Sequence, residues 1–140
     1  MKIIKLILCF VLAAVLCVSL CSCRQKNIEN IWESATYTSD KVFGDGAKAV
    51  TVEVKAEDKS VSFLINTDKE TLGEALVEYG LIAGEKSAYG LYVKKVNGIE
   101  ANYDINKTYW ALTKNGKSVT SGVDGIKVSD GEHYEMTYTK

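Results

Sequence analysis

The sequence predicts an α+β fold: a small β-grasp-like domain with a mixed sheet and one main helix, following a signal peptide and a polar tether. Three observations indicate this fold. Apolar residues alternate with polar ones between positions 50 and 65, recur with a helical period between 72 and 79, and alternate again in short runs up to 138. A hairpin, one helix and further short strands can bury their apolar faces together if the sheet packs on one side of the helix.

The first expected element is a hairpin. Apolar residues from Val50 to Ala56 alternate with Thr, Glu and Lys, which is typical of a strand with one buried face. The polar stretch 57–59 can turn the chain, and Val61, Phe63 and Ile65 repeat the alternation on the way back.

The expected helix follows this hairpin. Thr67 and Glu70 have the spacing of a capping box, in which the hydroxyl and the carboxylate bond to free backbone N–H groups. An apolar stripe follows at i, i+3, i+4 and i+7, formed by Leu72, Ala75, Leu76 and Tyr79. Gly80 can adopt the left-handed conformation that ends a helix.

Short strands and turns are expected in the remainder of the chain. Residues 82–88 read as a polar loop, and Asn97-Gly98 as a turn with positive φ values. The expected strands are 91–96, 109–113, 118–119, 126–128 and a last one carrying Tyr134, Met136 and Tyr138, with turns at 114–117, 122–125 and 129–132.

The N-terminus predicts export and lipid anchoring. Two lysines precede an apolar run of about 15 residues, which is shorter than the ~20 that span a bilayer. The run ends in Leu20-Cys-Ser-Cys23, which resembles a bacterial lipobox and implies cleavage after Ser22 and diacylation of Cys23. We therefore expect a signal peptide at 1–22, a lipidated cysteine and tether at 23–48, and a domain at 49–140 on the outer face of the cell membrane.

The cysteines and the histidine limit the chemistry. All four cysteines lie at or before Cys23, so the expected domain has no thiol for a disulfide, a metal or a nucleophile. His133 is the only histidine, and we expect it on the surface with no metal site. Asp124 and Asp130 lack calcium-loop spacing and read as turn residues. No catalytic constellation is visible, so an enzyme is not expected.

Charge argues against nucleic acid as a partner. Lys2 and Lys5 leave with the signal, which leaves 15 basic and 18 acidic side chains in the mature chain. These charges are interspersed, and no basic stripe is present to neutralise phosphates.

The expected tether from Arg24 to about Lys48 is polar and has no lasting apolar period. Trp32, Tyr37 and Phe43 are its exceptions. They fit either a short segment that folds back on the domain or aromatic residues near the membrane surface.

Five aromatic residues lie close together in the sequence: Tyr89, Tyr92, Tyr103, Tyr109 and Trp110. Such rings suit either packing of a sheet on a helix or recognition of a flat amphipathic ligand or another protein. Because Tyr109 and Trp110 are adjacent in an expected strand, they should point to opposite faces.

Six short motifs occur in the order seen in one known family. They are Thr71–Leu76 (TLGEAL), Gly90–Val93 (GLYV), Asn97–Ala101 (NGIEA), Lys107–Trp110 (KTYW), Gly122–Asp124 (GVD) and Asp130–Glu132 (DGE). Together they resemble the DUF4430 family and the related C-terminal β-domain of the cobalamin carriers transcobalamin and intrinsic factor. The resemblance covers roughly residues 50–138.

The resemblance implies a ligand site and its residues. In the carriers, two segments of this domain close over cobalamin from one side, while a large helical domain supplies the opposite wall. By motif position these segments correspond to Tyr89, Gly90, Leu91, Tyr92 and Val93, and to Trp110, Leu112, Thr113, Lys114, Asn115 and Gly116.

The expected function is therefore a lipid-anchored, non-enzymatic binding module. Its implied ligand is cobalamin or another corrinoid, and no cofactor is required. A second envelope protein could supply the missing wall. The alternative is a protein-interaction or adhesion module of the bacterial envelope that uses the same face.

Overall fold

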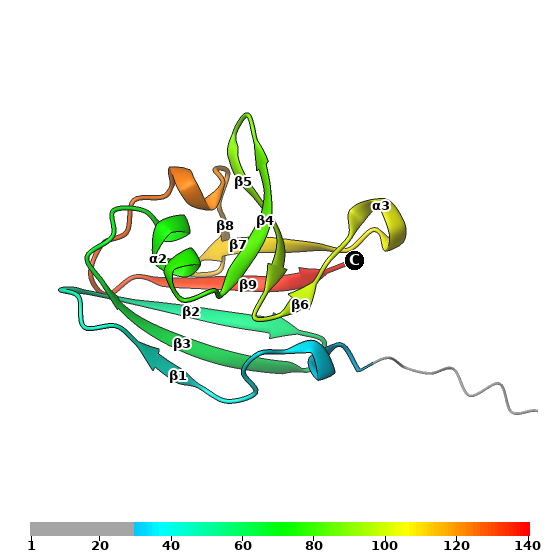
Figure 1. The fold of residues 1–140 in the computed structure, drawn as a ribbon, viewed down its shortest axis with the longest axis horizontal. Helices are drawn as coiled ribbons and strands as arrows, with labels where there is room; N and C mark the ends of the chain where they lie inside the picture. The colour runs from blue at the N-terminus through cyan, green and yellow to red at the C-terminus, as the bar shows by residue number, and fades with distance from the viewer. Residues whose placement is uncertain (1–29) are drawn as a thin grey trace, which may run out of the picture.

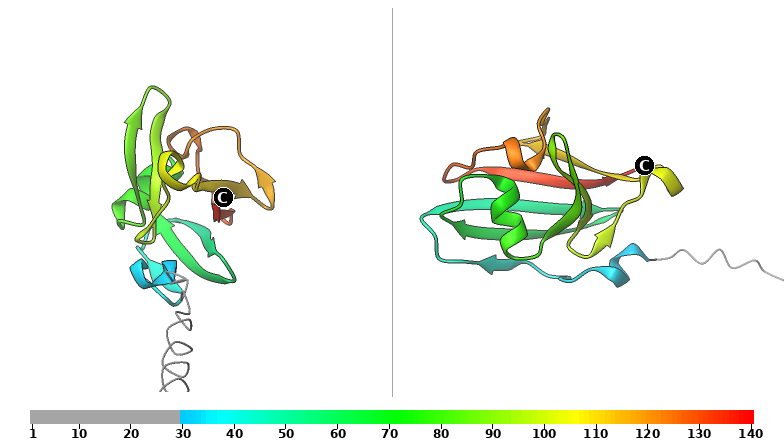
Figure 2. Two further views of the ribbon diagram at one scale, coloured as in Figure 1. Left: turned by 90° about the vertical axis from the view of Figure 1, so that its right-hand side faces the viewer. Right: turned by 45° about the horizontal axis from the view of Figure 1, so that its top comes forward.

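The computed structural model describes residues 30–140, which form two β-sheets with one main helix (Figure 1). The larger sheet is mixed and has the strand order β1-β3-β2-β9-β7-β8, and the smaller sheet has the order β4-β5-β6. The helix and the smaller sheet cover one face of the larger sheet (Figure 2). The expected mixed sheet with one main helix is confirmed. The more specific β-grasp assignment stays a prediction.

The centre of the larger sheet is the expected hairpin. Strands β2 (Lys48–Ala56) and β3 (Lys59–Thr67) pair antiparallel in full register around a two-residue turn. Strand β9 (His133–Thr139) pairs parallel with β2, and β7 (Tyr109–Lys114) pairs antiparallel with β9. The alternating apolar residues of β2, β3 and β9 are buried, so they form the core face of this sheet.

Helix α2 (Leu72–Glu78) buries Leu72, Ala75 and Leu76 of the expected stripe, but it begins later than predicted, and Tyr79 is its half-buried C-cap. The N-cap is Thr71, whose side chain accepts from the backbone N–H of Glu74 while the Glu74 carboxylate accepts from the backbone N–H of Thr71. The predicted box at Thr67 and Glu70 is wrong. Thr67 ends β3, and its hydroxyl accepts from the N–H of Lys69 at 3.0 Å.

The smaller sheet contains a strand where a loop was expected. Strand β4 (Ile82–Ser87) pairs with β5 (Gly90–Val96), and β5 pairs with β6 (Ile99–Glu100) through the expected Asn97-Gly98 turn. Only Ile82 of β4 is buried, so this strand has no apolar alternation to reveal it. The register of the β4–β5 pair shifts at Gly84. A Cβ atom at this position would lie 1.8 Å from the carbonyl oxygen of Tyr92, so the backbone leaves no room for a side chain.

The C-terminal third of the chain lacks one of the strands that the sequence predicted. Helix α3 (Tyr103–Asn106), which was not predicted, leads into β7. The Lys114–Lys117 turn leads into β8 (Lys117–Ser118), as predicted. The chain then forms the short 3-10 helix η3 (Val123–Gly125). The expected strand at 126–128 is reduced to a single bridge between Lys127 and Thr71.

Residues 30–48, expected to be tether, pack on the domain instead. The 3-10 helix η2 (Ile31–Ser34) buries Trp32, whose indole Nε1–H donates to the carbonyl of Ala56 at 2.9 Å. Strand β1 (Lys41–Phe43) pairs parallel with β3. The expected boundary at residue 48 is therefore wrong for the described part of this segment, and the alternative of a segment that folds back is the one the structure shows.

Buried Asn97 holds this segment in place. Its side-chain NH₂ donates to the carbonyl of Tyr37 at 2.8 Å, its Oδ1 accepts from the N–H of Tyr37 at 2.9 Å, and its backbone carbonyl accepts from the N–H of Thr36. Tyr37 also packs edge-on against Phe63, with the ring centroids 5.8 Å apart. Phe43 packs against the same ring in a tilted arrangement at 5.9 Å.

The expected signal peptide and Cys23 lie outside the described residues. Within residues 30–140, no helix combines the length and hydrophobicity needed to cross a membrane.

Candidate functional site

A groove lies between the smaller sheet and the β7 side of the larger sheet. Two adjoining hollows of about 210 and 500 Å³ share Tyr92, Val93 and Trp110 in their walls. We call them together the β5–β7 groove. Figure 2 shows the β4–β5 hairpin standing apart from the β7–β8 hairpin on the other side of this space.

The inner part of the groove is apolar. Besides the shared residues, its walls include Leu91, Leu112, Val119, Val123 and Met136. These residues come from β5, β7, the segment after β8, η3 and β9, so no short stretch of sequence could have indicated all of them.

Trp110 forms the floor where the two hollows meet. It is only 8 % exposed, its indole Nε1–H donates to the carbonyl of Ile99 at 3.2 Å, and its ring packs edge-on to Tyr138 at 5.4 Å. Trp110 is therefore a core residue with one surface turned to the groove. Tyr109 next to it is 41 % exposed, and it lines the outer hollow together with Trp110.

Tyrosines line the outer part. Tyr92 is 47 % exposed on β5, and Tyr103 and Tyr109 contact each other edge-on at 6.5 Å. The ammonium of Lys107 lies 4.8 Å from the centre of the Tyr103 ring. Exposed rings of this kind offer a flat apolar face with a polar edge.

Five of the residues implied by the resemblance meet in the β5–β7 groove: Leu91, Tyr92, Val93, Trp110 and Leu112. The other six do not line it. Tyr89 is 93 % exposed at the tip of the β4–β5 hairpin, and Thr113 lies on the opposite face of the larger sheet, where its hydroxyl donates to Glu135.

Lys114, Asn115 and Gly116 form the tip of the β7–β8 hairpin. Lys114 and Asn115 line a separate hollow of about 420 Å³ with Lys117 and Val119. Asn115 and Gly116 have φ values of 50° and 77°, as the predicted turn requires. The tip adjoins the groove through Val119 but contributes no wall to it.

The base of this tip is fixed by Glu132. Its carboxylate accepts from the Tyr134 hydroxyl at 2.6 Å and from the backbone N–H of Ser129, and it pairs with the ammonium of Lys114. Burial raises the pKa of Glu132, but these partners outweigh it and lower the pKa below the ordinary value. For Tyr134, burial and then the bond to Glu132 raise the pKa of the phenol.

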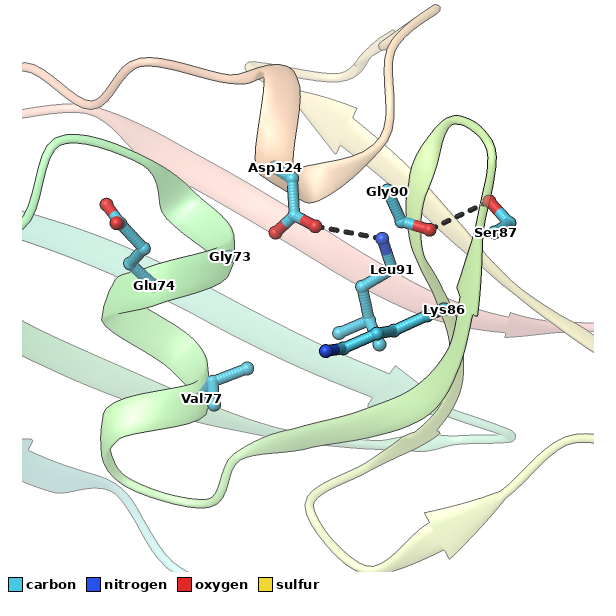
Figure 3. Close-up of a pocket in the computed structure, with 8 residues that line it drawn as sticks. All are labelled: Gly73, Glu74, Val77, Lys86, Ser87, Gly90, Leu91 and Asp124. Atoms are coloured by element: carbon cyan, nitrogen blue, oxygen red, sulfur yellow. Dashed lines mark hydrogen bonds between the residues drawn. The ribbon is translucent and has the colours of Figure 1, made fainter.

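Gly90 belongs to another hollow, of about 430 Å³, between α2, the β4–β5 hairpin and η3 (Figure 3). The carboxylate of Asp124 accepts from the N–H of Leu91 at 2.8 Å and joins η3 to β5. A Cβ at Gly73 or Gly90 would lie within 3 Å of that carboxylate, so both glycines make room for it. Asp124, expected as a turn residue, thus also fixes the position of β5.

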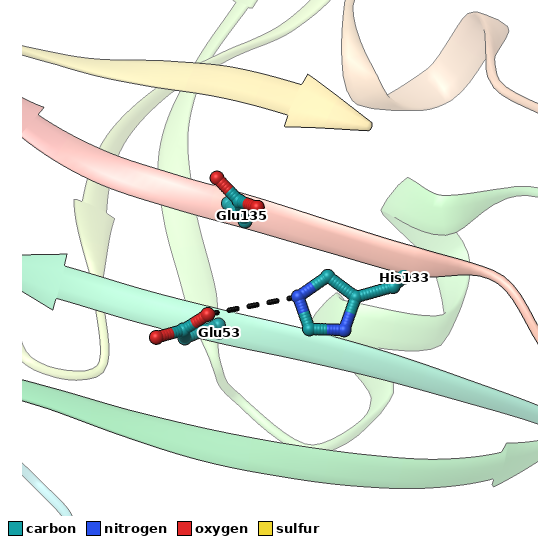
Figure 4. A group of neighbouring side chains, drawn as sticks. All are labelled: Glu53, His133 and Glu135. Atoms are coloured by element: carbon teal, nitrogen blue, oxygen red, sulfur yellow. Dashed lines mark ion pairs between the residues drawn. The ribbon is translucent and has the colours of Figure 1, made fainter. Parts of the chain in front are cut away.

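A third group of side chains lies on the opposite face of the larger sheet. His133, which was expected on the surface with no metal site, lies beside Glu53 and Glu135 there (Figure 4). Within the described residues these three form the one group of His, Cys, Asp and Glu side chains close enough to share a metal ion.

The comparisons with known proteins agree with the expected family. The model of the family described as "Domain of unknown function (DUF4430)" matches residues 69–140, which is just over half of the chain, so the chain belongs to this family. No curated protein matches the chain.

Two solved structures show the same fold. One is a candidate metal-binding protein from Ruminococcus gnavus ATCC 29149, with 35% sequence identity and a TM-score of 0.63; the match covers 66% of this chain and 97% of that chain. The other is haptocorrin in complex with Cbi, with 20% identity and a TM-score of 0.57; the match covers 66% of this chain and 25% of haptocorrin. The similarity to haptocorrin shows a shared fold and does not by itself show a shared ligand.

Proposed function

We propose that the protein is a non-enzymatic, lipid-anchored binding module whose β5–β7 groove binds a flat amphipathic small molecule, a corrinoid such as cobalamin or Cbi. One observation carries this proposal. Two segments about 20 residues apart, which the family resemblance implicates in binding, meet in the walls of one aromatic groove.

The groove suits such a ligand in its chemistry. Apolar walls with a few polar groups at their edges are typical of small-molecule sites. Haptocorrin, which shares the fold, was crystallised with the corrinoid Cbi, and this supports a search among corrinoids first.

The affinity should be low. The groove is open to solvent on its outer side, and an open groove buries less of a ligand than the 70–90 % typical of a pocket. We expect a Kd in the micromolar range or weaker, which corresponds to about −8 kcal/mol at best.

Calorimetric titration of the purified full chain in detergent with cobalamin and cobinamide tests the ligand. Tyr92→Ala removes an exposed ring from the groove and should weaken binding by about 5- to 30-fold, as expected for the loss of about 1–2 kcal/mol of ring contact. Tyr89→Ala is the matched control, because Tyr89 is exposed at the hairpin tip outside the groove. It should leave the Kd within about twofold.

Two results would contradict the corrinoid proposal. One is the absence of heat with either ligand at several hundred micromolar. The other is equal weakening by the two tyrosine variants, which would place any contact at the hairpin tip rather than in the groove.

The proposed anchor rests on Cys23. Leu20-Cys-Ser-Cys23 follows a short apolar run, and two acyl chains hold a protein stably to a membrane. Mass spectrometry of the mature N-terminus should find a diacylated Cys23. Cys23→Ser should block processing while Cys21→Ser should not; an unmodified chain that begins at Met1 would refute the anchor.

The second candidate is a protein-interaction or adhesion module that uses the same face. The exposed rings of Tyr89, Tyr92, Tyr103 and Tyr109 favour it, since tyrosine is enriched in protein interfaces. Under this function, Tyr89→Ala and Tyr92→Ala should both reduce attachment of cells to their partner surface, and corrinoids should not compete.

A further inference from the structure

The face of the larger sheet opposite its core carries a compact group of ionisable side chains. Glu53 lies on β2, and His133 and Glu135 lie on the neighbouring β9. Because β2 and β9 pair in parallel, Glu53 is the register partner of Glu135, and His133 is the partner of Thr51. All three side chains therefore project from adjacent positions of the most central strand pair (Figure 4).

The distances between their ligand atoms suit one metal ion. His133 Nε2 lies 3.6 Å from Glu53 Oε2, and one ligand atom from each of the three residues can be chosen so that all lie within 4.8 Å of one another. Zinc bonds of about 2.1 Å in a tetrahedral arrangement put ligand atoms about 3.4 Å apart. Small side-chain rotations would therefore bring the three ligands to an ion and leave its fourth position open.

One of the two carboxylates is oriented by the neighbouring strand β7. The Thr113 hydroxyl donates to the Glu135 carboxylate at 3.0 Å. A partner that orients a ligand in this way is typical of metal sites. Glu53 and Glu135 are each about one fifth exposed, so an ion can reach them from solvent.

A cation already lies between the two carboxylates. The ammonium of Lys55 is 3.5 Å from Glu53 and 3.4 Å from Glu135. The Lys55 side chain is 38 % exposed, so it can turn to solvent when another cation enters.

We propose that Glu53, His133 and Glu135 form a site for a divalent transition-metal ion of the zinc type, with Lys55 as a competing cation within the chain. The imidazole nitrogen selects such an ion over magnesium or calcium, which prefer oxygen ligands. The site lies on the face of the sheet opposite the β5–β7 groove, and it does not depend on what the groove binds.

Calorimetric titration with zinc tests the proposal, using the protein purified without a histidine tag and with any free cysteine alkylated. We expect one zinc per chain. His133→Gln should weaken binding at least tenfold because it removes the nitrogen ligand. Lys55→Gln should tighten it several-fold because it removes the competitor. Glu100→Gln, a change at an exposed glutamate on β6, is the matched control and should leave the affinity unchanged.

Because His133 is the only histidine, its imidazole signals in a nuclear magnetic resonance spectrum give a second readout that needs no variant. Zinc should shift or broaden them at one equivalent, while magnesium at the same concentration should not. The proposal is overturned if the imidazole signals do not respond to zinc, or if His133→Gln binds zinc as tightly as the unaltered chain. If Lys55→Gln binds zinc no more tightly than the unaltered chain does, then Lys55 does not compete with the metal ion for the site.

Discussion

The indole of Trp32 connects the N-terminal segment to the core. The ring is 6 % exposed, and its Nε1–H donates to the last carbonyl of β2 at 2.9 Å. An indole buries a large apolar area and carries one polar group that needs a partner. A single side chain thus gives this otherwise polar segment a defined place on the domain.

Trp32→Ala should therefore destabilise the protein by about 3–5 kcal/mol, the usual cost of truncating a buried aromatic residue. Trp32→Phe should cost less, because it retains most of the apolar area and loses mainly the hydrogen bond to Ala56. Urea unfolding curves measure both values.

The control is Val42→Ala, in the same segment. Val42 is 66 % exposed, so its truncation should change the free energy of unfolding by no more than about 0.5 kcal/mol. Similar small effects of Trp32→Ala and Val42→Ala would contradict the packing of Trp32.

At the scale of an element, the start of α2 shows how a correct motif can be assigned to the wrong place. Thr67-x-x-Glu70 and Thr71-x-x-Glu74 both fit the capping-box pattern. Thr67 is taken by β3, where it pairs with Lys48 at the end of the hairpin. The pairing partner is distant in sequence, so the local pattern could not decide between the two threonines.

Thr71→Ala should cost about 1 kcal/mol of stability, because it leaves a helix N–H without its acceptor. Glu70→Ala, which would break the rejected box, should change stability by less than about 0.5 kcal/mol. Thermal unfolding of the two variants decides between the two capping boxes. A larger loss of stability for Glu70→Ala than for Thr71→Ala would favour the box at Thr67 and Glu70.

The charge of Glu74 makes part of this cap depend on pH. The backbone N–H and then the hydroxyl of Thr71 lower the pKa of Glu74 below its ordinary value of 4.5. A lowered carboxyl pKa contributes stability above the unfolded-state pKa, and this contribution disappears as the pH falls through the folded-state value. The difference in stability between the unaltered chain and Glu74→Gln should therefore be constant above about pH 5.5 and shrink below about pH 4.5. A difference that grows on acidification would contradict this cap.

Strand β4 marks the limit of prediction from periodicity. Alternation predicted β2, β3, β5, β7 and β9 because one face of each of these strands contributes to the core. Residues 83–87 of β4 are exposed on both faces, and only their backbone pairing with β5 makes them a strand. Such a strand leaves no apolar signal in the sequence.

Across the whole molecule, features encoded by residues close together in the sequence could be predicted, whereas features that bring distant residues together could not. The family resemblance implied that segments of β5 and β7 contact one ligand, and the structure brings five of the implied residues into one groove. Val123 and Met136 reach the same groove from distant elements, and no local pattern indicated them. The group of Glu53, His133 and Glu135 was missed for the same reason, because it depends on the parallel register of β2 and β9.

The N-terminal segment had the weakest sequence signal and has many long-range contacts. Residues 30–46 supply a buried indole, two aromatic rings against Phe63 and an edge strand on β3. They also satisfy the amide of Asn97, which is fully buried. Removing the segment would expose the apolar surface beneath it and leave this amide without its protein partners.

A chain that starts at Ala47 should therefore unfold well below one that starts at Asn30, which retains all of these contacts. The loss of Trp32 alone should cost about 3 kcal/mol or more, and each kcal/mol lowers the midpoint of a domain of this size by about 4–8 °C. We expect the midpoint to fall by about 12 °C at the least, or the shorter chain to fail to fold. Calorimetric melting of both chains, with circular dichroism to confirm the fold, provides the measurement. Cooperative unfolding of the shorter chain within about 5 °C of the longer one would mean that residues 30–46 behave as the tether their composition suggests, and that their contacts contribute little to stability.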